Sequence, residues 1–214
     1  MASNSILSQG TRFQIQKLGT NGSPKTITGI SAANPAVVTS TAHGLATGDV
    51  VAIASVVGMT QVNGQSYAIK NLTANTFELV GCNSTSFTAY TSGGTATPFT
   101  FLESNEHKSY TVSPGQASDI DKTTMISTAK EFGVGLSDTG TFDVELNYVE
   151  ADVAQVEMKI GLLDSSERWF RIIKRNGGIS AMKGSVRSLS ETGAVDGIFT
   201  GSLSVRLSGT KYEV

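Results

Sequence analysis

The chain has 214 residues, with 16 Lys and Arg against 18 Asp and Glu, so it has the length of one medium or two small domains and lacks the basic excess of a nucleic-acid coat protein. Charged residues make up 16%, whereas Ser and Thr number 51 and Gly 23, a composition typical of strands and turns. No apolar run is long enough for a transmembrane helix, the start does not have the pattern of a signal peptide, and the single Cys82 excludes an internal disulfide framework.

The first 97 residues divide into a short polar segment and a nearly uncharged one. Residues 1–26 hold one strand candidate, Thr11–Leu18. Residues 27–97 contain three charged side chains, and their apolar runs alternate with Gly-, Asn- and Thr-rich turns, which predicts a small β-barrel or sandwich. The predicted strands of this segment are Val50–Val57, Tyr67–Asn71 and Phe77–Val80. We expect Thr91–Thr97 to be a flexible exit linker.

Residues 98–214 combine strand patterns with one helical pattern. Thr141–Tyr148 alternates apolar and polar residues, which predicts a half-buried strand. After it, apolar residues recur at the 3.6-residue period of a helix that Asn147 or Asp152 is expected to cap. This apolar stripe comprises Val149, Val153, Val156, Ile160 and Leu163.

Three further strands complete this half. They are predicted at Arg168–Lys174, at Ile179–Leu189 after an Asn-Gly-Gly turn, and at Ile198–Leu207, where Phe199 lies on the apolar side. The expected fold class is mainly β, an α+β arrangement in which one helix packs on a β-sandwich. We expect residues 1–26 and 98–214 to form one discontinuous domain and residues 27–97 to be an inserted small β-barrel, because insertion at a hairpin tip costs little entropy.

Residue types used in catalysis are few and poorly placed. Cys82 has no nearby histidine to activate it, and His43 precedes a turn without a second ligand spaced for a metal. Gly133-Val134-Gly135 lacks the third glycine of a phosphate-binding loop. Asp143 and Glu145 share one strand face, and a glycosidase would use such a pair, but without an aromatic sugar platform around them the pattern favours a solvated strand face. We expect no enzyme activity, no metal and no cofactor.

The charges form two opposed blocks. Eight acids and two bases lie between Asp119 and Asp152, whereas six bases and no acid lie between Arg168 and Arg187. The six bases are Arg168, Arg171, Lys174, Arg175, Lys183 and Arg187. The blocks face each other within one sheet, or they join neighbouring subunits head to tail, as in rings and filaments.

A long polar segment, Ser113–Gly135, has no clear period and contains scattered apolar residues. A loop of this length in a compact domain is usually functional or disordered. Its residues Ile120, Met125, Ile126 and Phe132 favour burial, which indicates an arm that orders against a neighbouring subunit.

This segment and its surroundings resemble the tail tube (major tail) proteins of bacteriophages with long non-contractile tails. The resemblance covers residues 8–26 and 98–209. It rests on Asp119–Phe132, Gly135-Leu136, Asp138–Thr141, Trp169-Phe170, Ala181–Gly184 and the closing strand from Asp196-Gly197 to Ser208-Gly209.

A second resemblance covers residues 36–97. This segment is similar to the small β-barrel of the first catalytic-cysteine half-domain of ubiquitin-activating enzymes, a module also found in phage tail proteins. The similar positions are His43–Leu45, Thr47–Asp49, Gly58–Thr60, Asn63-Gly64, Asn75–Leu79 and Tyr90–Gly94. Ubiquitin chemistry is not implied, because no adenylation domain accompanies the module.

The first resemblance implies a virion structural protein, made in the host bacterial cytoplasm, that forms hexameric rings stacked into a tube for DNA ejection. It implies other tail proteins as partners (tape measure, tail tip and terminator), passage of double-stranded DNA without specific binding, and no membrane. The long loop would bridge neighbouring subunits and rings through Asp119, Ile120, Asp121, Lys122, Thr123, Thr124, Met125, Ile126, Lys130 and Phe132.

The remaining expectations concern the surfaces of the tube. An acidic lumen would repel DNA phosphates, which makes Asp143 and Glu145 the lumen candidates, and the six bases are expected between subunits or rings. The module at 27–97 would lie on the exterior. The alternative is a virion or cell-surface binding or adhesion module for a glycan or protein, in which residues 27–97 hold the ligand.

Overall fold

The computed structural model describes residues 7–214, so the first six residues of the expected segment 1–26 lie outside it. The described chain is mainly β with one α-helix, which confirms the predicted class. The helix α1 spans Val153–Asp164, and a short 3₁₀ helix η1 spans Thr60–Val62. The strands are β1 (Arg12–Asn21), β2 (Lys25–Thr26), β3 (Gly29–Ile30), β4 (Ala36–Thr39), β5 (Val50–Val57), β6 (Ser66–Thr73), β7 (Thr76–Leu79), β8 (Ser92–Ser104), β9 (His107–Ser113), β10 (Ala117–Asp121), β11 (Phe132–Ser137), β12 (Thr141–Asn147), β13 (Glu167–Ile173), β14 (Ile179–Leu189), β15 (Thr200–Leu207) and β16 (Tyr212–Glu213).

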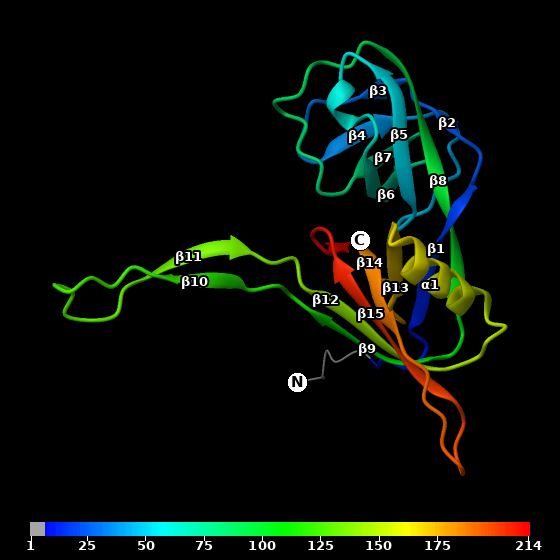
Figure 1. Ribbon diagram of the computed structural model, residues 1–214. Coiled ribbons are helices and arrows are strands. Elements are labelled where there is room, and N and C mark those ends of the chain that lie inside the picture. The colour runs from blue at the N-terminus through cyan, green and yellow to red at the C-terminus, as the bar shows by residue number, and fades with distance from the viewer. Residues whose placement is uncertain (1–6) are drawn as a thin grey trace, which may run out of the picture.

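Most of these strands belong to one continuous antiparallel path (Figure 1). Its order is β3-β4-β7-β6-β5-β8-β1-β13-β14-β15-β12-β9, with β2 paired to β8 and β16 paired to β14. The strands from β2 to the first half of β8 form one lobe, which we call the module, and the remaining strands form the body. The hairpin β10-β11 is a separate two-stranded sheet that leaves the body.

The long strand β8 joins the two lobes. Its first half pairs with β5 in the module, and its second half pairs with β1 in the body. The expected flexible linker at Thr91–Thr97 is therefore wrong, because these residues are hydrogen-bonded strand. Gly93 and Gly94 adopt φ of 71° and 102° there, and a Cβ on Gly94 would lie 2.6 Å from Val56 Cγ2.

Each lobe has its own hydrophobic cluster. The module cluster includes Ile53, Phe77 and Leu79, and the body cluster includes Phe13, Phe142 and Phe170. Within the body, the rings of Phe13 and Phe142 lie 5.6 Å apart and those of Phe142 and Phe170 lie 5.9 Å apart. Aromatic pairs at such distances stabilise a core beyond their buried area alone.

A third cluster lies where module and body meet. It joins Val50 and Ala68 of the module to Trp169 and Ala181 of the body. Trp169 Nε1 donates a hydrogen bond to Ser66 Oγ at 2.9 Å. Arg171 donates to Gly48 O at 2.9 Å and forms an ion pair with Asp49 at 3.1 Å. The two lobes are thus packed together, not tethered by a loose segment.

The helix α1 has the expected position in the chain but presents an unexpected face to the sheet. Asp152 is its cap and accepts from the backbone N–H groups of Ala154 and Gln155. The buried positions are Ala154, Gln155, Glu157, Met158 and Gly161, whereas the predicted apolar stripe is 40% to 86% exposed. The stripe predicts the helix, but it does not pack on the sheet.

Candidate interaction surfaces

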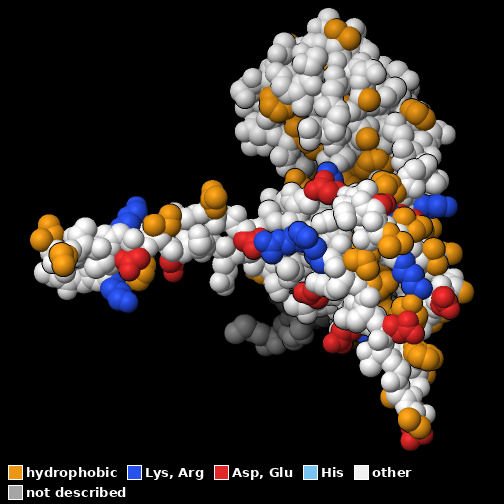
Figure 2. Space-filling model, in the orientation of Figure 1, with side chains coloured by type: hydrophobic (Ala, Val, Ile, Leu, Met, Phe, Trp, Pro, Cys, Tyr) orange, Lys and Arg blue, Asp and Glu red, His pale blue; other side chains and the backbone are white. Residues whose placement is uncertain are grey.

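The hairpin β10-β11 forms a projecting ribbon, here called the arm (residues 117–137). It corrects the expected loop, because Asp119 pairs with Val134 and Asp121 with Phe132 in an antiparallel ladder. Figures 1 and 2 show the arm extending far from the body with both faces in solvent. Its exposed large apolar side chains are Ile120, Met125, Ile126, Phe132, Val134 and Leu136, of which Met125, Ile126 and Leu136 are more than 90% exposed.

The local sequence explains the shape of the arm. Asp121 accepts from the backbone N–H of Thr123 at 2.8 Å, and hydrogen bonding from Thr123 lowers the pKa of this carboxyl group. Lys122 N donates to Glu131 O, which closes the ladder before the tip. The glycines of Gly133-Val134-Gly135 lie in β11, where a Cβ on Gly133 would lie 2.4 Å from the Lys122 side chain. These glycines serve close packing in a ribbon.

A second exposed apolar surface, here called the strip, follows the outward face of α1. Its members are Val149, Val153, Val156, Ile160 and Leu163. Beside it, Tyr148, Lys159, Leu162, Leu163, Leu189 and Glu191 line a hollow of about 290 Å³. A hydrogen bond with Tyr148 raises the pKa of Lys159, and the nearby charges of Glu150 and Glu191 also raise it. Acidic groups therefore lie beside this hollow. Figure 2 shows apolar side chains gathered over α1, on the opposite side of the body from the arm.

The acidic pair on β12 lies on a face rich in hydroxyl groups. Asp143 accepts from Ser204 Oγ at 2.6 Å and from Thr141 Oγ1 at 3.1 Å, and Glu145 accepts from Ser109 Oγ at 2.9 Å. The neighbouring strands β9 and β15 thus supply the partners from both sides. Phe142, Val144 and Leu146 point to the core on the other face, as the alternation predicts.

The six bases of the basic block have different surroundings. Arg168 is fully buried and binds Glu157 and Asp164, and Arg171 binds Asp49 and Gln14. Lys174 and Lys183 form exposed pairs with Glu213 and Glu167. Arg175 and Arg187 are exposed. Within residues 7–214, no ion pair joins the basic block to the acidic block between Asp119 and Asp152.

The candidate catalytic side chains are not brought together. Cys82 is buried in the module, and burial raises the pKa of its thiol. His43 Nδ1 accepts from Leu45 N and its Nε2 faces Thr73 O, so both ring nitrogens serve the turn, as expected for a structural histidine. Over the part of the chain that is described, no group of three or more His, Cys, Asp or Glu side chains is arranged to hold a metal ion.

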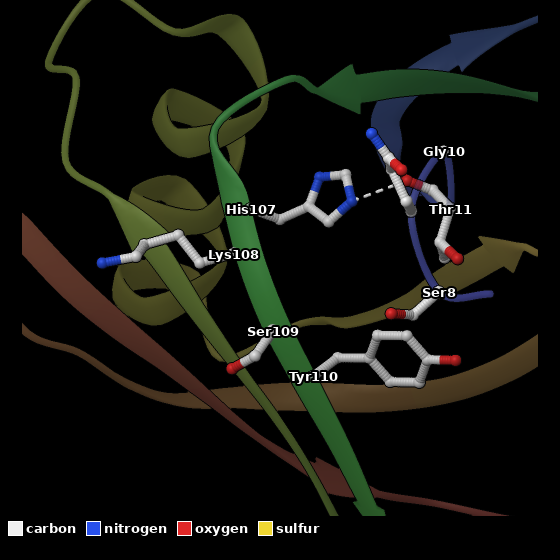
Figure 3. A pocket seen from close by; sticks show the side chains of 8 residues that line it. Ser8, Gly10, Thr11, His107, Lys108, Ser109 and Tyr110 are labelled. Carbon is white, nitrogen blue, oxygen red and sulfur yellow. Dashed lines mark hydrogen bonds between the residues drawn. The ribbon is translucent and has the colours of Figure 1, made fainter.

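A cavity of about 650 Å³ lies between the segment before β1 and strand β9 (Figure 3). His107 points into the gap and bonds the carbonyl oxygens of Ser104 and Thr11 at 2.9 and 2.8 Å. Lys108, Ser109 and Tyr110 complete its wall on the β9 side. Both His107 nitrogens thus face backbone carbonyls, which hold the imidazole between the two segments.

The sequence pattern singled out the segment that forms the arm, as a loop, and the β12 acids, whose roles stay predictions, but it did not identify the strip as a surface. Its residues were identified, but as the side of a helix that packs on a sheet. Two signals pointed the other way. Glu157 lies in the middle of the helical segment with Arg168 eleven residues further on, and the small residue Gly161 follows Glu157 by one helical turn, on the same side of the helix.

Comparison with known proteins finds a similarity for one segment of the chain. Residues 33–99 match the ubiquitin-activating enzyme E1 FCCH domain, which agrees with the resemblance of residues 36–97. No curated protein matches the chain. Within residues 7–214, α1 is too short to cross a bilayer.

Among solved structures, the tail of an empty GTA particle with C6 symmetry has 18% sequence identity and a TM-score of 0.42, over 54% of this chain and 86% of that chain. The residues that match the E1 FCCH domain, 33–99, include strands β4 to β7 and the first half of β8, all in the module.

Proposed function

We propose that this chain is a structural subunit of a bacteriophage tail tube, assembling as stacked hexameric rings into a hollow conduit for DNA ejection. One observation carries the proposal: the arm exposes six large apolar side chains on a two-stranded ribbon that has no core of its own. An isolated two-stranded hairpin is marginally stable in water, and exposed apolar patches of this kind mark interaction sites. The sequence resemblance to tail tube proteins supports the same function.

The polar face of β12 has the chemistry expected of the inner wall of the tube. Asp143 and Glu145 stand among serine and threonine hydroxyls from β9 and β15. Carboxylates on the wall repel DNA phosphates, and neutral hydroxyls add no cation to hold them, so DNA would pass without tight binding. We therefore assign this face to the lumen and assign no catalytic role to the two acids.

The module would then lie on the exterior of the tube. It is packed against the body at Trp169 and Arg171, so it would move with the subunit as a rigid projection. Arg168 and Arg171 are engaged in the interior, and Lys174 and Lys183 pair with Glu213 and Glu167 at the surface, which leaves Arg175 and Arg187 as the bases of the block without an ion pair in residues 7–214 and available between subunits or rings. Tape measure, tip and terminator proteins would be the other partners in the virion.

Electron microscopy of negatively stained protein over a concentration series tests the proposal. We expect six-fold rings or hollow tubes from the full chain. The matched variant replaces residues 122–131 by Asn-Gly, which closes a two-residue hairpin, and should stay dispersed with an unchanged melting temperature. Dispersed full-length protein at every concentration would argue against self-assembly and favour the binding-module alternative.

A further inference from the structure

The outward face of α1 is an apolar surface that the fold itself leaves uncovered. Val153, Val156, Ile160 and Leu163 are 60%, 41%, 45% and 86% exposed. A surface helix of a globular domain normally turns such a stripe toward the core. Here the helix buries Gln155 and Glu157 instead.

The inward polar contacts fix the helix in this orientation. Glu157 Oε1 accepts from the fully buried Arg168 Nε at 2.9 Å and from Leu18 N at 3.2 Å. Gly161 lies against the same guanidinium, since a Cβ there would lie 3.1 Å from Arg168 Nη1. Rotating the helix to bury the strip would break these bonds and leave charges unpaired inside, which is costly. The exposure of the strip is therefore a stable feature of the subunit.

The hollow beside the strip can accommodate an apolar side chain of a partner. Leu162 and Leu163 on α1 and Leu189 on β14 form its apolar lining, with Glu191 and Lys159 at its edge. A volume of about 290 Å³ accommodates one or two aliphatic side chains. Single exposed leucines are ordinary on a surface, but a contiguous strip with a hollow is typical of an interaction site.

The tip of the arm presents apolar side chains that suit the apolar hollow. Met125 and Ile126 stand at its end and are almost fully exposed. Lys122 and Lys130 are the charged residues nearest the tip, with Asp121 and Glu131 next to them at its base, and the exposed carboxylates of Glu150 and Glu191 beside the strip can pair with the two lysines. Arm and strip lie on opposite sides of the body (Figures 1 and 2), so the arm of one copy is directed away from its own strip.

We propose that the arm tip of one subunit docks on the α1 strip of a second copy, with Met125 and Ile126 entering the hollow beside Leu163. This rests on the proposed self-assembly and names the surface that receives the arm. Opposed surfaces of this kind make a heterologous, head-to-tail contact, which closes into rings or continues as a filament.

A mixing experiment with two exposed-site variants tests the docking. The arm variant is Met125→Asp with Ile126→Asp, and the strip variant is Ile160→Asp with Leu163→Asp. Leu72→Asp, at a 44% exposed position in the module, is the matched control. Sedimentation velocity should show assembly of wild type and control, and each test variant should need at least about tenfold more protein to associate.

The mixture discriminates between the outcomes. The strip variant has an intact arm and the arm variant has an intact strip, so an equimolar mixture should form a two-chain complex that does not grow. A mixture without this complex, or a strip variant that assembles like wild type, would overturn the docking and leave the tube proposal standing. Wild type that never associates would instead overturn the tube proposal and the docking with it.

Cross-linking provides a second readout that does not depend on weakening the interface. Ile126→Cys with Leu163→Cys should give a disulfide-linked ladder of oligomers on a non-reducing gel. Ile126→Cys with Leu72→Cys should give no more than dimers, and the native Cys82 is buried. Equal ladders from both pairs would overturn the docking.

Discussion

Arg168 on β13 is fully buried, and its Nε lies 2.9 Å from Glu157 Oε1 on the inward face of α1. Its other nitrogens donate to Asp164 Oδ1 and Oδ2 at 2.9 and 2.8 Å. One guanidinium therefore holds both the middle and the end of the helix against the sheet. This contact decides which face of α1 is left for a partner.

Arg168→Met should lower the free energy of unfolding by about 3–5 kcal/mol, because it leaves the Glu157 carboxylate buried without its partner. The double variant with Glu157→Leu should recover much of this loss, since it removes the stranded charge. Urea denaturation of the wild type, both single variants and the double variant measures the coupling. Additive effects would contradict the assigned pairing.

Lys183→Ala is the matched control for that cycle. Lys183 and Glu167 form an ion pair on the neighbouring strands, but their side chains are 39% and 44% exposed. Exposed pairs contribute about 0–1 kcal/mol. A loss comparable to that of the Arg168 variant would show that burial does not govern these pairs.

The acid sensitivity of the helix attachment follows from Asp164. Hydrogen bonds from Arg168 lower the pKa of Asp164 from 3.8 to about 2. A carboxyl group with a lowered folded-state pKa contributes stability above its unfolded value, and this contribution is lost as pH falls through the folded value. Stability should therefore decline between about pH 4 and pH 2. Asp164→Asn should flatten this part of the curve in thermal melts, and an unchanged slope would contradict the assignment.

Charge reversal on the arm separates assembly from folding. Asp119→Lys with Asp121→Lys changes two exposed residues of the ribbon, so the melting temperature of the body should hold. Asp119 and Asp121 lie on strand β10, before the tip that docks beside Glu150 and Glu191, so their reversal tests a separate contact of the ribbon with a neighbouring subunit. If that contact exists, we expect fewer or no tubes in electron micrographs. Tubes at wild-type abundance would reject an inter-subunit role for these two carboxylates.

Local patterns were sufficient to predict the helix and the strands β1, β5, β6, β7, β12, β13, β14 and β15. The strand at Val50–Val57 is predicted by a continuous apolar run, the strand at Ile179–Leu189 by the turn before it, and β12 by strict alternation. All three agree with the structure because each signal is local in the sequence. The cap at Asp152 is similarly local, since its carboxylate bonds residues two and three positions ahead.

The failures concern contacts between distant residues. The Thr91–Thr97 segment has linker composition, but pairing with β5 supplies backbone hydrogen bonds that composition does not reveal. Phe199 was placed on the apolar side of its strand, but it is 57% exposed near the β14-β15 tip. The outward strip of α1 was missed because periodicity identifies an apolar face without saying what covers it. The residue of the sheet that contacts the inward face of α1 is Arg168, and because it is charged, a pattern of apolar residues does not indicate this contact.

Trp169 provides the sharpest test of how the module is attached. It is the only tryptophan in the chain, it is 2% exposed between the lobes, and its Nε1 donates a hydrogen bond to Ser66 Oγ across the interface.

Gly22 N donates to Pro98 O at 2.8 Å, so a short Gly/Ser bridge can replace residues 27–97. The shortened chain should fold and form narrower tubes, but its Trp169 emission should shift to longer wavelength because the module face has gone. Adding Trp169→Gln should reduce aggregation of that variant. A shortened chain that fails to fold in both forms would mean that the module is integral to the core of the body.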